Sequence, residues 1–359
     1  MMFGVPIARS LSRFHFSFHS PPLLTTIRLR AFSTEASLDK GSVTSEILKE
    51  FRATIENAPA ASSAKVCYAY IDKICKDGNL SALSQMLQML NDKNIVVSPN
   101  VYNLMLVEAI QNNDIDLSFQ VLKKLLLSGE SPTATSCIKF ARAFRNVNHS
   151  VELLRFLKEI VSETSCSSIS SFINKIIFAF AKSGQKDSAL VIFSLLKRQN
   201  DGVLDLITYN IVLDILGRMG QVDEMLDVFA SLKKSGFVPD TISYNTLING
   251  LGKVGRSDLC FAYFEEMKKN GNEPNLLTYT ALIDTFGGAG NIEESLKLFG
   301  EMKLKGILPS IQIYRSLIHN LTKIEKIELA TELLGEMNSS STSLPGPRDF
   351  KTKRRQRKT

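Results

Sequence analysis

The sequence predicts an all-α fold, an α-solenoid (right-handed superhelix) of about eight 35-residue helix–turn–helix repeats. The first observation is that residues of one type recur at steps of 35 along the second half of the 359-residue chain. The second is the spacing inside each unit, where apolar residues lie three and four positions apart, as on one face of a helix. Two amphipathic helices cannot bury their apolar faces alone, so we expect successive pairs to stack, with the first helices lining the concave face.

Five sets of residues keep the 35-residue step. They are Tyr209, Tyr244, Tyr279 and Tyr314; Gly236, Gly271 and Gly306; Pro239, Pro274 and Pro309; Phe229, Phe264, Phe299 and Leu334; and Met267, Met302 and Met337. Gly and Pro at these places end the second helix of a unit. The tyrosines and phenylalanines of these sets are expected in the core.

The repeat divides the chain into segments. We expect a mitochondrial transit peptide over 1–36, a lead-in segment over 37–63 with one helical stretch near Glu46–Ile55, and a basic C-terminal tail over 346–359. The repeats between them are expected at 64–98, 99–133, 134–169, 170–205, 206–240, 241–275, 276–310 and, as a partial unit, 311–345.

The charge lies mostly at the two ends. The first 36 residues sum to +3 and the last twelve to +6, so that residues 37–347 sum to −2 although the whole chain carries +7. The near-neutral charge of residues 37–347 therefore gives no electrostatic reason to expect that this part of the chain binds nucleic acid. The first segment is rich in Arg and Ser and has no acid before Glu35, as in organelle transit peptides. "RAFST" at 30–34 favours a mitochondrion over the alternative, a chloroplast; a merely disordered N-terminus is the other reading.

At this point the sequence can be compared with a known repeat. "TYNIVLDILGRMGQVDEMLDVFASLKKSGFVPD", residues 208–240, closely resembles the pentatricopeptide repeat of P-class, plant organellar proteins. The resemblance covers about 64–340 and is strongest in 206–310. The 34-residue tetratricopeptide repeat is the nearest alternative, but the constant 35-residue step and the Tyr-Asn that starts the first helices argue against it.

The resemblance implies single-stranded RNA binding, one nucleotide per repeat. In this family the fifth and last residues of a unit read the base, and the second residue sandwiches it. The reading pairs would be Asn174 with Asp205, Asn210 with Asp240, Asn245 with Asn275, and Thr280 with Ser310, together with Asn103, whose partner is Thr133. The sandwiching residues would be Ser171, Ile207, Ile242, Leu277 and Gln312.

By this analogy the RNA core reads U-U-C(U)-A from the unit at 170–205 onward, and the unit at 99–133 favours a pyrimidine. Tyr68, Ile138 and Arg315 at the fifth position form no recognisable pair, so their units would supply stacking or backbone contacts. An Asn amide both donates and accepts hydrogen bonds, which suits a base edge. The alternative for the Asn residues is helix N-terminal capping.

The basic tail offers phosphate contacts through Lys353, Arg354, Arg355, Arg357 and Lys358. A nuclear-type signal or a ribosome-associated tail is the alternative reading of these residues.

We expect no enzyme, and therefore no catalytic residue, cofactor or small-molecule substrate. The editing deaminase tail found in some members needs His-x-Glu, paired Cys-x-x-Cys and a terminal Asp-Tyr-Trp. No His of this chain is followed by x-Glu, and the chain has no Trp. The five scattered cysteines form no CxxC pair, which indicates no metal site and no disulfide framework, and no apolar run is long enough for a membrane helix.

Two function classes follow. The first is an RNA-binding factor for stabilisation, processing, splicing or translation of an organelle transcript. The alternative is a non-catalytic scaffold, such as a mitochondrial ribosome-associated protein that uses the solenoid for protein interaction. Ribosomes or other RNA-processing proteins are the partners that these two classes imply.

Overall fold

The computed structural model describes residues 35–57, 60–144, 147–163, 166–199 and 202–339, and it places seventeen α-helices and no strand among them. The predicted transit peptide up to residue 34 and the basic tail lie outside these described residues. By contacts the chain divides into two compact units, Met1–Glu50 and Phe51–Thr359. Helix α1 (Glu35–Asn57) begins eleven residues before the predicted stretch at Glu46, since no proline occurs between Pro22 and Pro59 to stop a helix.

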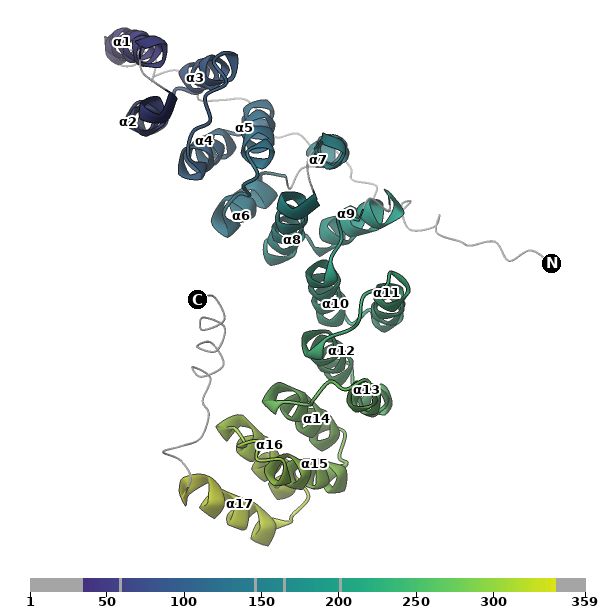
Figure 1. Ribbon diagram of the computed structural model, residues 1–359. Coiled ribbons are helices and arrows are strands. Elements are labelled where there is room, and N and C mark those ends of the chain that lie inside the picture. The colour runs from purple at the N-terminus through teal and green to yellow at the C-terminus, as the bar shows by residue number, and fades with distance from the viewer. Residues whose placement is uncertain (1–34, 58–59, 145–146, 164–165, 200–201, 340–359) are drawn as a thin grey trace, which may run out of the picture. The chain divides into compact units, whose positions relative to one another are not determined.

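The second unit consists of consecutive helix pairs (Figure 1). Its first helices are α2 (Ala60–Asp77), α4 (Pro99–Gln111), α6 (Ala134–Ala143), α8 (Cys166–Lys182), α10 (Leu206–Met219), α12 (Thr241–Lys253), α14 (Leu276–Gly288) and α16 (Ile311–Lys323). Its second helices are α3 (Leu80–Asp92), α5 (Ile115–Leu127), α7 (Val147–Glu163), α9 (Lys186–Gln199), α11 (Val222–Lys234), α13 (Ser257–Lys269), α15 (Ile292–Leu304) and α17 (Ile327–Ser339).

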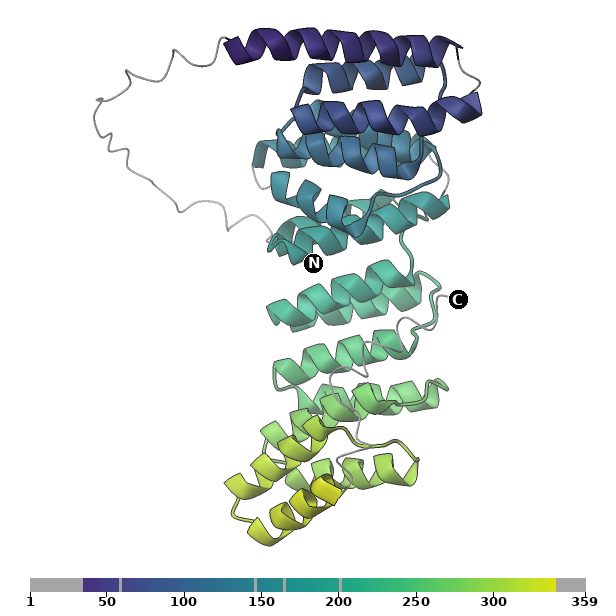
Figure 2. The same cartoon turned by 90° about the vertical axis from the view of Figure 1, so that its left-hand side faces the viewer.

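Each first helix packs against the first helix of the next pair, from α2 through to α16. Figure 2 shows these helices lying side by side in chain order. The all-α solenoid that the sequence predicts is therefore confirmed, while its handedness stays a prediction. Helix α8 begins at Cys166, before the expected unit start at 170, because Ile169 offers no side-chain cap at that boundary.

The repeated aromatic residues join one pair to the next. Tyr209, Tyr244, Tyr279 and Tyr314 are all at most 2% exposed, which confirms their predicted place in the core. Each ring meets, edge to face, a Phe from the second helix of the preceding pair, as in Phe229–Tyr244 at 5.4 Å and Phe264–Tyr279 at 5.8 Å between ring centroids. Such pairs contribute about 0.5–1.5 kcal/mol beyond the area that they bury.

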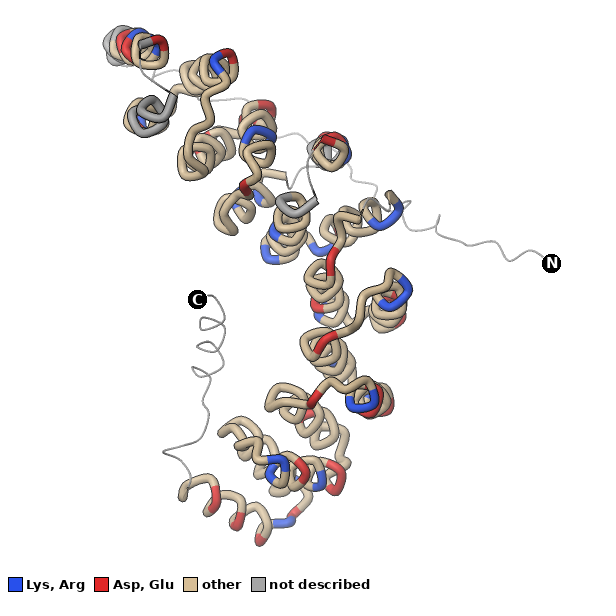
Figure 3. The backbone as a smooth tube through the Cα atoms, in the orientation of Figure 1, with Lys and Arg blue, Asp and Glu red and all other residues tan. Residues whose placement is uncertain are grey.

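The tyrosine hydroxyls extend this contact into a polar link. Tyr314 donates to Glu336 at 2.8 Å, and Lys303 of the preceding pair holds the same carboxylate at 2.5 Å. Tyr244, Glu266 and Lys233 repeat the arrangement, with 2.8 Å and 2.9 Å. Figure 3 shows the resulting mixture of both charge signs on α11, α13 and α15. The second helices are therefore tied together by short ion pairs.

Helices α10 and α12 approach each other closely at two glycines. A Cβ atom added to Gly217 would lie 2.9 Å from the Cα of Gly250, a distance that real Cβ atoms do not show. Backbone-to-backbone contact of this kind needs the absence of a side chain on both helices.

Four of the cysteines, Cys67, Cys75, Cys137 and Cys260, are buried free thiols. Burial raises the pKa of the Cys137 thiol to about 12, as it does that of Cys75 and Cys260. They behave as small apolar groups. Among the described residues, no helix has the length and apolar character that a membrane crossing requires.

We expect Gly217→Ala to lower the free energy of unfolding by about 1–2 kcal/mol, because α10 and α12 must move apart and this outweighs the gain in helix propensity. Urea unfolding followed by circular dichroism measures the change. Gly300→Ala in α15 is the matched control, since no atom lies within 4 Å of its added Cβ. A Gly217→Ala protein as stable as the Gly300→Ala protein would contradict the close approach.

Acid should weaken the polar links between pairs. Burial alone would raise the pKa of Glu301 and Glu336, but hydrogen bonds from Tyr279 and Lys305, and from Lys303 and Tyr314, hold both values below the usual range. A carboxyl whose pKa is lowered by folding stabilises the fold above its unfolded pKa, near 4.3, and this contribution is lost as pH falls through the folded value.

The urea midpoint should therefore drop between pH 5 and pH 3, and it should drop less in the Tyr279→Phe/Tyr314→Phe protein. This variant should also lose about 1 kcal/mol per removed hydroxyl at pH 7. Tyr102→Phe is the control, because the hydroxyl of Tyr102 is hydrogen-bonded to the backbone of Val97 and not to a carboxylate. Equal acid-induced losses in both variants would refute the role of the carboxylates.

Candidate nucleic-acid interface

In five places the last residue of a unit caps the first helix of the next, while Ser98 makes no side-chain cap to α4 and Ile169 offers none. The Oδ1 atoms of Asp205 and Asp240 each accept a hydrogen bond at 2.8 Å from a backbone N–H three residues on. Asn275 accepts from Leu277 and Thr278, and Thr133 and Ser310 cap α6 and α16 in the same way. Capping, the alternative considered for the fifth-position Asn residues, is thus performed by their expected partners.

In two of the predicted reading pairs the side chains are hydrogen-bonded to each other. Nδ2 of Asn174 donates to both carboxylate oxygens of Asp205, at 3.1 and 3.0 Å, and Nδ2 of Asn245 donates to Oδ1 of Asn275 at 3.2 Å. Asn174 is only 8% exposed. Asn245 is half-buried and Asn275 is exposed, so their amides are accessible at the surface.

Asn210 and Asp240 lie at the same positions but form no hydrogen bond with each other among the described residues. Oδ1 of Asn210 is buried without a partner. Oδ2 of Asp240 is not used by the cap, which engages Oδ1 alone. In this unit the cap leaves Oδ2 of Asp240 unused, and the amide oxygen of Asn210 has no hydrogen-bond partner.

The other two pairs differ from this pattern. Thr280 donates to the backbone oxygen of Leu276 at 2.6 Å. Its expected partner Ser310 is only 2% exposed and accepts from the backbone of Ile313, so the two hydroxyls have different hydrogen-bond partners. Oδ1 of Asn103 accepts from the backbone N–H of Thr133 at 3.0 Å, and its Nδ2 donates to Pro99 at 2.8 Å. The side chain of Asn103 is thus turned toward the backbone.

Three of the predicted sandwiching residues form an exposed apolar row. Ile207, Ile242 and Leu277 are 60%, 58% and 53% exposed, one on each of α10, α12 and α14. Water-exposed aliphatic side chains at one repeated position need a reason other than core packing. Ser171 is half-buried, with its hydroxyl 3.4 Å from that of Ser131, and Gln312 donates to Asp284 at 2.9 Å, so neither extends the row.

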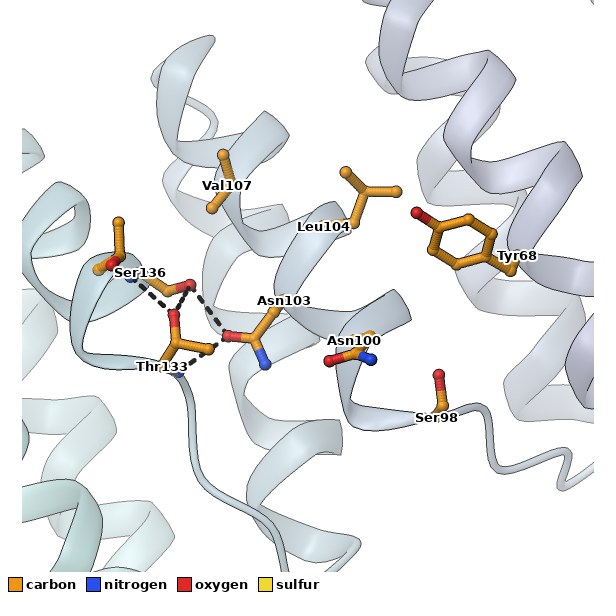
Figure 4. A pocket seen from close by; sticks show the side chains of 9 residues that line it. Tyr68, Ser98, Asn100, Asn103, Leu104, Val107, Thr133 and Ser136 are labelled. Carbon is orange, nitrogen blue, oxygen red and sulfur yellow. Dashed lines mark hydrogen bonds between the residues drawn. The ribbon is translucent and has the colours of Figure 1, made fainter. Parts of the chain in front are cut away.

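An open pocket of about 660 Å³ lies at the same positions of the earlier units. Tyr68, Leu104, Asn100, Asn103 and Thr133 are among the residues that line it. Figure 4 shows the Tyr68 ring directed toward Leu104, across the open space from Thr133. The ring is 47% exposed. A pocket of this size with an exposed ring can hold a flat ligand.

Comparison with known proteins identifies the repeats. Models of the PPR repeat family match residues 204–253, 239–288 and 278–323, and the PPR repeat matches 312–341. Residues 204–341 are pentatricopeptide repeats.

A pentatricopeptide repeat-containing protein of Arabidopsis thaliana is 42% identical to this chain over 123 residues, which are 34% of this chain and 33% of the relative. The chain spans about a third of the length of this curated relative. Among solved structures, the maize pentatricopeptide repeat protein PPR10 is 19% identical, with a TM-score of 0.45 over 89% of this chain and 50% of that one. Yeast Rmd9p in complex with a 16-nt target RNA is 12% identical, with a TM-score of 0.48 over 88% of this chain and 69% of that chain.

Sequence reasoning missed one set of residues in these pentatricopeptide repeats, the hydroxyls at the third position of a unit. Thr208 and Thr278, both fully buried, donate to Oδ1 of Asn174 and of Asn245, each at 2.6 Å. Ser136 donates likewise to Asn103 at 2.9 Å. A signal was present, because Thr208, Ser243 and Thr278 keep the 35-residue step, but a small hydroxylated residue near a helix start is also an ordinary capping-box residue.

The described residues contain no group of three or more His, Cys, Asp or Glu side chains placed to hold a metal ion. The five basic residues predicted to contact phosphate, Lys353 to Lys358, lie outside the described part of the chain.

Proposed function

We propose that this chain binds single-stranded RNA through its pentatricopeptide repeats, one base per repeat, without catalysis. The observation that carries the proposal is the exposed row of Ile207, Ile242 and Leu277 beside polar side chains at the fifth and last positions of the same units. A base between two aliphatic walls gains contact whatever its identity, and adjacent polar groups can then select it.

The exposed polar atoms differ between units in a way that suits different bases. Oδ2 of Asp240 can only accept a hydrogen bond, which suits the N3–H group of uridine. The cap uses Oδ1 of Asn275 and leaves its Nδ2 available to donate, which suits the N3 acceptor of cytidine. We therefore propose U for the unit at 206–240 and C over U for that at 241–275, within the core U-U-C(U)-A.

We further propose that the chain acts in organelle RNA metabolism, in the mitochondrion. The Arg- and Ser-rich composition of residues 1–36 supports an imported protein. A chain that holds a transcript segment unpaired would protect or expose it without any chemical step.

An RNA oligomer that contains UUCA should bind the full chain at least tenfold more tightly than the same oligomer with those four bases scrambled, because each base-specific hydrogen bond contributes about 0.5–1.5 kcal/mol. Fluorescence anisotropy at fixed salt measures both dissociation constants. Higher salt should weaken both complexes by a similar factor, since phosphate contacts do not depend on sequence. Equal affinities at one salt concentration would refute the proposed base reading.

The pocket at Tyr68 should accept the nucleobase that lies 5′ of the bases read by the later units. Tyr68→Ala should weaken binding of a longer oligomer, extended at its 5′ side, by about five- to a hundredfold, the usual effect of removing one stacking ring. Tyr68→Phe keeps the ring and should bind as the unmodified protein does. If Tyr68→Ala weakens the binding of a UUCA oligomer that lacks the extension as much as it weakens binding of the longer one, Tyr68 has no separate stacking role.

A further inference from the structure

The buried hydroxyls at the third position of a unit sit behind the reading residues of the unit before. Thr278 belongs to α14, but its Oγ1 lies 2.6 Å from Oδ1 of Asn245 on α12. Thr208 of α10 reaches Asn174 of α8 at the same distance. Both threonines are fully buried, so water does not compete for these contacts.

Each contact fixes the orientation of the Asn amide, because its two ends have different partners. The carboxylate of Asp205 can only accept, so the amide group of Asn174 that faces it must be the NH₂ group. In the later unit, Oδ1 of Asn275 already accepts from the helix backbone, so it too requires an NH₂ group from Asn245. The remaining amide oxygen then faces the threonine hydroxyl, its donor.

The unit at 206–240 shows what happens without this contact. The third-position hydroxyl that follows this unit, Ser243 of the unit at 241–275, donates to Oδ1 of Asp240 at 2.8 Å. Oδ1 of Asn210 then remains buried without a partner, and Asn210 forms no hydrogen bond to Asp240 among the described residues. The same serine keeps its capping-box contacts, so capping and amide orientation are separate roles.

We propose that Thr278 and Thr208 are positioning residues that determine base specificity, because their hydroxyls hold the amides of Asn245 and Asn174 in one orientation. This inference rests on the proposed RNA binding. A freely turning amide presents a donor or an acceptor to the base with little preference. Loss of the hydroxyl should therefore reduce discrimination between bases more than it reduces overall affinity.

The test compares three variants of the full chain. Thr278→Val keeps the shape and removes the donor, Thr278→Ser keeps the hydroxyl, and Ser243→Ala removes a capping-box hydroxyl that does not touch the amide of Asn210. Each variant is titrated at one salt concentration with two series of UUCA oligomers. The first series carries C, U, A or G at the third base and tests the Thr278 variants, and the second carries each base in turn at the second position and tests Ser243→Ala. Thermal midpoints report on capping.

We expect Thr278→Val to reduce the preference for C at the third base by about five- to tenfold, the effect of one hydrogen bond, and Thr278→Ser to keep it within about twofold. Ser243→Ala should lower the thermal midpoint yet leave discrimination at the second base unchanged. Thr278→Val with full discrimination, or Ser243→Ala with an equal loss at its own base, would overturn the inference. An unmodified protein that distinguishes no bases would contradict the proposed function as well.

Discussion

A helix must satisfy the free N–H groups of its first turn, and from α10 to α16 the last residue of the preceding unit accepts from them. Asp205, Asp240 and Asn275 each accept from the N–H group three residues on. The helices α10, α12 and α14 therefore each begin at a polar side chain that a hydrogen bond holds in place. That side chain is also the partner, or near neighbour, of the fifth-position residue of its own unit, as in Asn174 with Asp205 and Asn245 with Asn275. The start of a helix and the polar part of the candidate interface therefore form one structure.

Where the last residue of a unit caps the next helix, this dual role restricts which residues can occupy that position. Only side chains with a short acceptor cap a helix well, which leaves Asp, Asn, Ser and Thr. All four occur at this position, at Asp205, Asp240, Asn275, Ser310 and Thr133. They differ in whether a donor or an acceptor remains after the cap is made. Helix capping thus allows a few chemically different side chains at the last position, and the units differ in which of these side chains they carry.

The sequence predicted the helices, the repeat and the buried aromatic residues correctly from 206 onward, because one period of 35 governs all of them. It did not predict the orientation of polar side chains whose hydrogen-bond partners lie in a neighbouring unit, because the 35-residue spacing says nothing of which donor meets which acceptor. The orientation of the Asn103 amide toward Pro99, the inward turn of Ser310 and the loss of contact at Asn210 each depend on neighbouring donors one unit away. The pocket at Tyr68 likewise lies between units whose resemblance to the repeat is weak.

The contact between Asn245 and Thr278 crosses the boundary at which the units are conventionally divided. A repeat cut out at residues 241–275 would leave behind the hydroxyl that holds its amide, together with the N–H groups that its last residue caps. Exchange of single units between such proteins would therefore create hybrid sites with untested geometry. A transferable module should be cut after the third residue of the following unit, so that it carries its own support with it.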